Sequence, residues 1–276
     1  MTPALMPDSI SPKEGGTCMR NVAALSVGDI VKTTLVVYFN NLPAFLPLSL
    51  IVLVPTFLVV LLPDSSSFND PPSLPDPGAD PVAAFDTVFP YYIVVVREGL
   101  VGMLCGFLLH AALAYGVVRH LRGGQASFLA SLVQFAGCAT AVLAVAVIVT
   151  AATSIGFVFL IIPGVWLTLV LWVALPALVV ERGGLRAIAR SAELTRGFRW
   201  PIFGLALILV AAQVVVGNVA SWMVSNTLPD GFPRWCAMQF VVVVMSGIYA
   251  TAVAVTYHDL RVLKEKADTP ASTVLD

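Results

Sequence analysis

Uncharged apolar runs long enough to cross a lipid bilayer fill most of this 276-residue sequence. A transmembrane helix needs about 20 predominantly apolar residues, and residues 42–62, 201–223 and 237–257 each supply such a run. Apolar residues make up 58% of the chain and charged residues only 11%, whereas soluble domains contain about 25% charged residues. The sequence therefore predicts an all-α, polytopic membrane protein.

Three further spans complete a set of six. The second span is expected at residues 99–118, and its helix can extend outward as far as Tyr91. Residues 133–180 carry no charge and are long enough for two crossings, the third and the fourth. Their turn falls either at residues 153–156 or at Pro163 and Gly164. Since proline favours the first turn of a helix, the second position is preferred.

The spans are expected to form one membrane domain, residues 26–266. Two disordered cytoplasmic tails, residues 1–25 and 267–276, flank it. An outer loop at residues 63–88 is rich in proline and aspartate, residue types that favour turns and extended chain. It connects the first two spans.

Lysine and arginine gather on one side of the predicted zigzag. With both termini inside, all but Arg97 and Arg234 of the 15 basic residues lie in inner segments. Basic residues bias a loop toward the cytoplasm. The sequence therefore predicts a multi-pass protein of the inner membrane with both termini in the cytoplasm.

An internal similarity suggests how the spans are grouped. The segment starting at Ile30 matches the segment starting at Ile188 without gaps, so that Pro43 corresponds to Pro201. Residues 126–135 hold the equivalent place before the third span. We expect three parallel units, each a short interfacial amphipathic helix followed by a transmembrane hairpin. Chance similarity between two juxtamembrane segments of biased composition is the alternative.

The inner segment 181–200 has the highest density of arginine. Its apolar residues recur at helical spacing, which predicts a short helix lying in the headgroup plane with these residues toward the membrane. They are Leu185, Ile188, Ala189 and Ala192. The arginines act either as a topology anchor or as a docking surface for anionic lipid headgroups or a partner protein. The candidate contacts are Arg182, Arg186, Arg190, Arg196 and Arg199.

Two smaller polar sets complete the candidates. Tyr257, Asp259 and Arg261 lie where the sixth span leaves the membrane, and Asp259 is expected to pair with an arginine of the 182–199 segment. Within the spans, polar groups are costly and often functional. His110, Gln213 and Asn218 are therefore candidate liners of a cavity between the hairpins.

The chain lacks the common catalytic motifs. The sequence contains no His-Glu-x-x-His zinc pair, no Gly-x-Ser-x-Gly elbow and no Walker loop. The formal net charge of −1 gives no reason to expect a nucleic-acid partner. A non-enzymatic protein without a cofactor is the expectation.

Several segments resemble bacterial membrane proteins that carry the glycerophosphoryl diester phosphodiesterase membrane domain. They are Ser26 to Ile30, Ile162 to Leu167, Pro176 to Arg182, Arg190-Ser191, Leu194 to Gly197, Arg199-Trp200 and Tyr257 to Arg261. The resemblance covers about residues 26–266 and implies a six-span membrane part. It implies no catalytic part, because in enzymes of that family the phosphodiesterase is a separate soluble barrel.

Two functions follow as hypotheses. The first is a scaffold or accessory factor that contacts lipid or partner proteins through its basic cytoplasmic face. The second is a transporter or lipid-handling protein with a cavity between the hairpins. A membrane-embedded enzyme ranks third. A polar-lined cavity near the midplane would favour the second function, and a core filled by small and aliphatic residues would favour the first.

Overall fold

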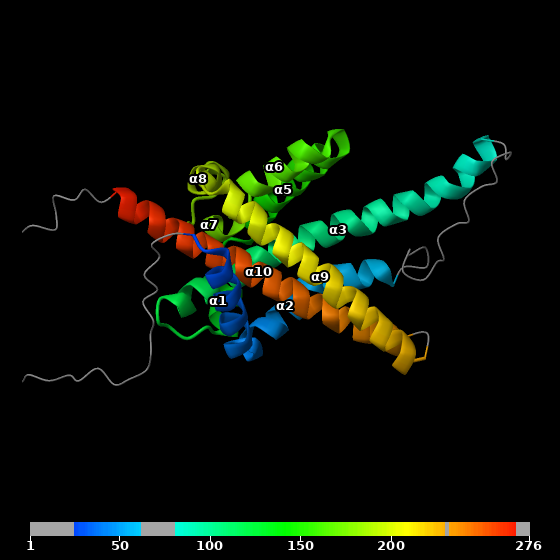
Figure 1. The fold of residues 1–276 in the computed structure, drawn as a ribbon, viewed down its shortest axis with the longest axis horizontal. Coiled ribbons are helices and arrows are strands. Elements are labelled where there is room, and N and C mark those ends of the chain that lie inside the picture. Colours follow the sequence, from blue (N-terminus) through cyan, green and yellow to red (C-terminus); the bar gives the residue numbers. More distant parts are fainter. Residues whose placement is uncertain (1–24, 62–80, 230–231, 269–276) are drawn as a thin grey trace, which may run out of the picture.

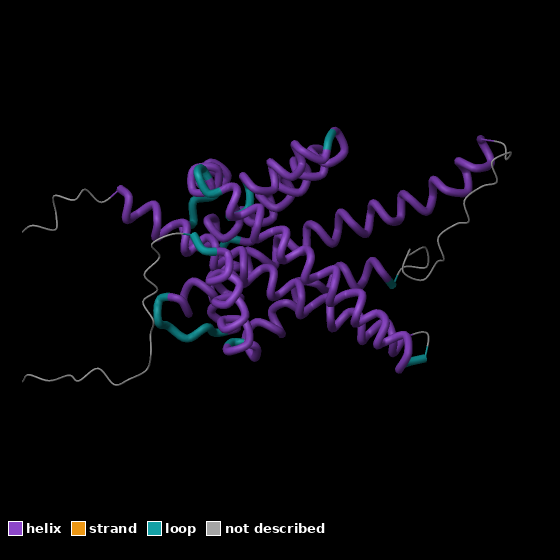
Figure 2. The backbone as a smooth tube through the Cα atoms, viewed as in Figure 1, coloured by secondary structure: helices purple, strands orange, loops and turns teal. Residues whose placement is uncertain are grey.

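The computed structural model describes residues 25–61, 81–229 and 232–268, and these parts of the chain form helices and no strand (Figures 1 and 2). The helices are α1 (Val27–Asn40), α2 (Leu42–Val60), α3 (Pro81–Leu121), α4 (Phe128–Gly137), α5 (Ala139–Phe159), α6 (Ile161–Val170), α7 (Ala174–Glu181), α8 (Arg186–Thr195), α9 (Arg199–Thr227) and α10 (Phe232–Asp268). The expected tails, residues 1–25 and 267–276, lie almost wholly outside the described residues.

Six helical stretches are long and apolar enough to span a membrane, which confirms the predicted six-span fold. They are α2, α3, α5, the pair α6 and α7, α9, and α10. Neighbouring spans pack as hairpins, and a short helix precedes each hairpin: α1, α4 and α8. In Figure 1, α1, α8 and the C-terminal end of α10 lie toward one end of the molecule, and the end of α9 and the start of α10 lie toward the other.

The third and fourth spans turn at Leu160, between the two predicted positions. Leu160 is extended, and α6 starts directly after it with Pro163 in its first turn, as the preference of proline for that position requires. The two arms of the hairpin are very close, because a Cβ atom on Gly156 would lie only 2.9 Å from Cα of Gly164. The turn thus falls where two glycines let the arms meet.

The second span starts earlier than expected. Its helix begins at Pro81, so residues 81–88, predicted to belong to the outer loop, are helical. The rest of the predicted loop lies mostly outside the described residues. At 41 residues, α3 is about 60 Å long, roughly twice the hydrocarbon thickness. The beginning of α3 therefore projects from the bundle (Figure 1).

Small residues bring the two central helices together. α3 packs against α2 and α10, and α10 also packs against α1 and α9. Ala111 and Ala114 on α3 and Ala250 and Ala254 on α10 are completely buried. Side chains of this size let helix backbones approach closely in a membrane. The centre of the bundle is therefore a packed core of small and aliphatic residues, with α3 and α10 at its middle.

The first short helix docks on α10 through one aromatic ring. Tyr38 of α1 is fully buried, and a Cβ atom added to Gly247 of α10 would lie 2.7 Å from its ring. A buried ring cannot move away without disturbing its neighbours. Because Gly247 has no side chain, it leaves the space in which Tyr38 packs and through which α1 contacts the core.

We expect Gly247→Ala to lower the free energy of unfolding by about 1–3 kcal/mol, the usual cost of overpacking a core. The control is Gly217→Ala on α9, where nothing lies within 4 Å of the added Cβ. Thermal unfolding in detergent measures both variants. Equal midpoints for the two would contradict this role of Gly247.

Candidate functional site

The five candidate arginines lie around α8, at the end of the bundle where the sixth span also exits (Figure 1). We call Arg182, Arg186, Arg190, Arg196 and Arg199 the arginine-rich face. The chain reverses between α7 and α8 because Arg182 and Gly184 both adopt positive φ angles, 52° and 55°. Glycine tolerates this conformation and ends many helices. The turn brings α8 back against α7.

The face of α8 that packs on the protein is not the apolar face that was predicted to lie toward the membrane. Ala187, Ser191, Leu194 and Thr195 are buried, whereas Leu185 is 62% exposed and Ala189 is also exposed. The spacing of apolar residues in the sequence does not predict this buried face, because two of its residues carry hydroxyl groups. Their partner explains the difference.

The helix of the fourth span is interrupted between α6 and α7, and α8 supplies a hydrogen bond to a carbonyl group at this interruption. The amide of Ala174 bonds to the carbonyl of Leu171, so the carbonyl of Val170 does not receive the usual bond from a residue four places on. Ser191 Oγ donates to the Val170 oxygen at 2.8 Å, and Thr195 Oγ1 lies 3.5 Å from the same oxygen. An unsatisfied carbonyl away from water costs several kcal/mol. Polar residues therefore hold α8 in place.

Glu181 is the hub of a polar network at this face, and the sequence analysis did not single it out. Tyr257 Oη on α10 donates to Glu181 Oε1 at 2.8 Å. Arg190 Nε lies 3.4 Å from Glu181 Oε2, and Arg190 Nη1 lies 3.0 Å from Glu193 Oε2. Burial lowers the pKa of Arg190, but its two carboxylate partners outweigh burial and raise that pKa. The network connects α7, α8 and α10.

The predicted cluster at the end of the sixth span divides into two parts. Arg261 Nη1 lies 3.5 Å from Tyr257 Oη, so these two residues belong to the network around Glu181. Asp259 is only 1% exposed, and its Oδ1 lies 3.6 Å from His258 Nδ1. The contact that reaches Arg190 from α10 runs through Tyr257 and Glu181. The sequence analysis predicted a contact between the end of the sixth span and the arginine segment, but it assigned that contact to Asp259.

The arginines of this face have three different environments. Arg182 donates to Gln134 Oε1 of α4 at 2.7 Å, and Arg190 pairs with the two glutamates described above. Arg199 lies over the ring of Trp166, 5.0 Å from its centre. Arg186 and Arg196 are exposed, and within the described residues no carboxylate pairs with either.

Two of the three predicted cavity liners meet in a pocket between the hairpins. His110 and Gln213 line a cavity of about 280 Å³ with Thr168, Ser246 and Tyr249. The ring of His110 stacks on Tyr249, with 5.5 Å between ring centres. Asn218 lies elsewhere, because it is exposed on α9 and donates to the carbonyl of Val214 one turn earlier. The structure thus does not bring Asn218 together with His110 and Gln213 in this pocket.

Over the described ranges, no three histidine, cysteine, aspartate or glutamate side chains gather as metal ligands would. Comparisons with protein-family models, with curated proteins and with solved structures give no match for this chain. The resemblance to the glycerophosphoryl diester phosphodiesterase membrane domain stays a prediction.

We expect Tyr257→Phe to lower the free energy of unfolding by about 1–2 kcal/mol, because it removes a hydrogen bond to a carboxylate. Tyr91→Phe on the projecting part of α3 is the control. A double-mutant cycle with Glu181→Gln, measured by thermal unfolding in detergent, isolates the pair. Additive effects of the two changes would show that Tyr257 and Glu181 are not coupled.

Proposed function

We propose that this chain is a non-enzymatic accessory or scaffold protein of the bacterial inner membrane, and that its arginine-rich face binds anionic lipid headgroups. One observation carries the proposal. Arg186, the first residue of α8, and Arg196, directly after its end, are exposed and have no carboxylate partner within the described residues, and Ser191 bonds this helix to the fourth span.

The surroundings of these arginines suit a headgroup layer. Leu185 and Trp200, just before α8 and just after it, are 62% and 83% exposed. Tryptophan is enriched at membrane interfaces, and an apolar residue beside basic ones is typical of interfacial helices. Arg186 also borders a hollow of about 440 Å³ with Glu181 and Arg190. Because Glu181 and Glu193 in this hollow both pair with Arg190, Arg186 is the cation there that an anionic headgroup would contact.

The orientation belongs to the proposal. Basic residues favour the cytoplasmic side, and with α8 and the end of α10 on that side both termini are cytoplasmic. Anionic lipids give the cytoplasmic leaflet a negative surface potential, and each basic residue near it contributes about 1 kcal/mol. The resemblance to the phosphodiesterase membrane domain supports the bacterial setting and adds no activity.

The pocket around His110 favours a second candidate function, the handling of a small polar solute or a lipid group. Its volume of about 280 Å³ is just below the usual range for ligand sites, about 300–1,000 Å³. Polar side chains from α3, α6, α9 and α10 converge in it, which a purely structural core does not require.

We expect the double variant Arg186→Gln/Arg196→Gln to bind phosphatidylglycerol about 30-fold more weakly. This corresponds to about 2 kcal/mol for two interfacial arginines. Affinity is measured by native mass spectrometry of the purified protein titrated with the lipid. Phosphatidylcholine binding should be unchanged, because that headgroup has no net charge.

The matched control is Arg119→Gln/Arg122→Gln, which removes the same charge from exposed positions in the last turn of α3 and directly after it. A loss of equal size in this control would mean that bulk charge, not the surface of α8, attracts the lipid. Unchanged phosphatidylglycerol binding in the Arg186/Arg196 variant would refute the proposal outright.

For the second candidate, we expect a cysteine at position 246 in a variant without the native cysteines (Ser246→Cys) to react with a water-soluble thiol reagent. The reason is that Ser246 lines the pocket. A cysteine replacing Val243, which is fully buried on the same helix, should stay unreactive. Mass spectrometry of the labelled protein measures both. No labelling at position 246 would rule out a water-accessible pocket.

A further inference from the structure

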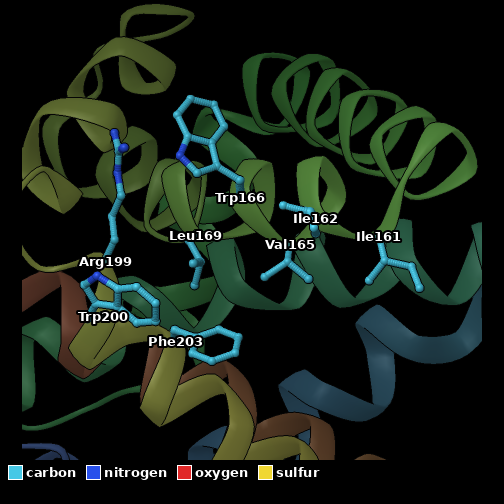
Figure 3. Close-up of a pocket in the computed structure, with 8 residues that line it drawn as sticks. All are labelled: Ile161, Ile162, Val165, Trp166, Leu169, Arg199, Trp200 and Phe203. Atoms are coloured by element: carbon cyan, nitrogen blue, oxygen red, sulfur yellow. The ribbon is translucent and has the colours of Figure 1, made fainter.

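An apolar groove lies between α6 and α9, and it shares no lining residue with the His110 pocket. Its volume is about 650 Å³, within the usual range for ligand sites. Five of the residues that line it are aliphatic or aromatic side chains without a polar atom: Ile161, Ile162, Val165, Leu169 and Phe203. Figure 3 shows them along one side of α6 and at the start of α9.

One charge lies at the end of this groove. Arg199, in the first turn of α9, extends beside Trp166 of α6 (Figure 3), and its guanidinium carbon lies 5.0 Å from the centre of that ring. Cation–π contact of this kind holds a guanidinium in place. Trp200 lines the same end. The groove is thus apolar along its length and cationic and aromatic at the arginine-rich face.

Arg199 lacks an acceptor for one of its donors. Its Nε atom is buried, and within the described part of the chain no hydrogen-bond partner reaches it. A buried polar group without a partner costs about 1–3 kcal/mol, and more when it is charged. A guanidinium binds phosphate through two parallel hydrogen bonds. The protein therefore does not use all the donors of this guanidinium, and an anionic oxygen is the partner that such a group binds most strongly.

We infer that the groove between α6 and α9 binds one anionic phospholipid, with its phosphate on Arg199 and one acyl chain along α6. Charge complementarity selects the headgroup, and the apolar lining selects the chain. A soluble phosphate would satisfy Arg199 but leave the groove empty. The helix of a second protein would fill the groove but leave Nε of Arg199 without an acceptor. A phospholipid meets both needs.

Arg199 belongs to the arginine-rich face, so the inference deepens the proposed function, but the groove is separate from the surface around Arg186 and Arg196 on which that proposal rests. Arg186 and Arg196 do not line the groove, and Arg199 contacts Trp166 instead of facing water freely. The inference relies on the predicted membrane setting but not on the lipid-binding role of α8. The two proposals can therefore fail independently.

The test uses the full-length protein, delipidated in detergent and titrated with phosphatidylglycerol or phosphatidylcholine in native mass spectrometry. We expect one phosphatidylglycerol to bind more tightly than all later ones. Arg199→Gln should weaken that first binding step about 10- to 100-fold, since a charge-assisted hydrogen bond is lost. Arg199→Lys, which keeps the charge, should lose less. Arg122→Gln should leave the first step unchanged.

A second variant tests the chain-binding part. Val165→Trp fills the middle of the groove without altering Arg199, and we expect it to weaken the first phosphatidylglycerol at least tenfold. Each variant is accepted only if its thermal unfolding midpoint in detergent stays near that of the wild type, and Val165→Leu is the milder replacement if it does not.

Three results would overturn the inference. One is equal first-step affinity in Arg199→Gln and the wild type. Another is displacement of the lipid by millimolar glycerol phosphate, which would indicate a site for the phosphate group alone. The third is a dimer mass that disappears in Val165→Trp while lipid binding stays, which would make the groove an interface between two copies of the chain.

Discussion

The carbonyl of Val170 is the constraint on which the functional end of this protein depends. The fourth span breaks after α6, so this oxygen would lie in the membrane domain without a hydrogen bond. Within a bilayer such a group must be satisfied by the protein itself. Ser191 supplies the bond from α8. The break in one span therefore fixes the position of a helix that does not cross the membrane.

Once α8 is fixed, what lies opposite each arginine decides its role. Arg190 faces Glu181, which Tyr257 of α10 also holds, so its charge serves to join helices. Arg186 and Arg196 face outward. Arg199, at the start of α9, lies against Trp166. Five residues that look equivalent in the sequence thus divide into structural contacts, an exposed cationic surface and one end of an apolar groove.

The sequence predicted what depends on composition alone and missed what depends on single contacts. Six spans follow from run lengths, because the hydrocarbon selects any sufficiently long apolar helix. The buried face of α8 could not be found this way, since Ser191 is buried for one hydrogen bond to a distant carbonyl. The turn at Leu160 needed the close approach of Gly156 and Gly164. The sequence suggested a functional role for Asn218, yet its side chain donates a hydrogen bond to a carbonyl group of its own helix.

The groove beside α6 has a physical origin in the same break. α5 and α6 pack tightly against each other at the two glycines, and α6 ends after ten residues. This hairpin therefore has little contact with α9. Only Ile202, Leu205 and Leu209 of α9 are buried. A groove between α6 and α9 consequently stays open. In a bilayer the surrounding material is lipid, and the one charge at the end of that space, Arg199, determines which lipid headgroup suits it.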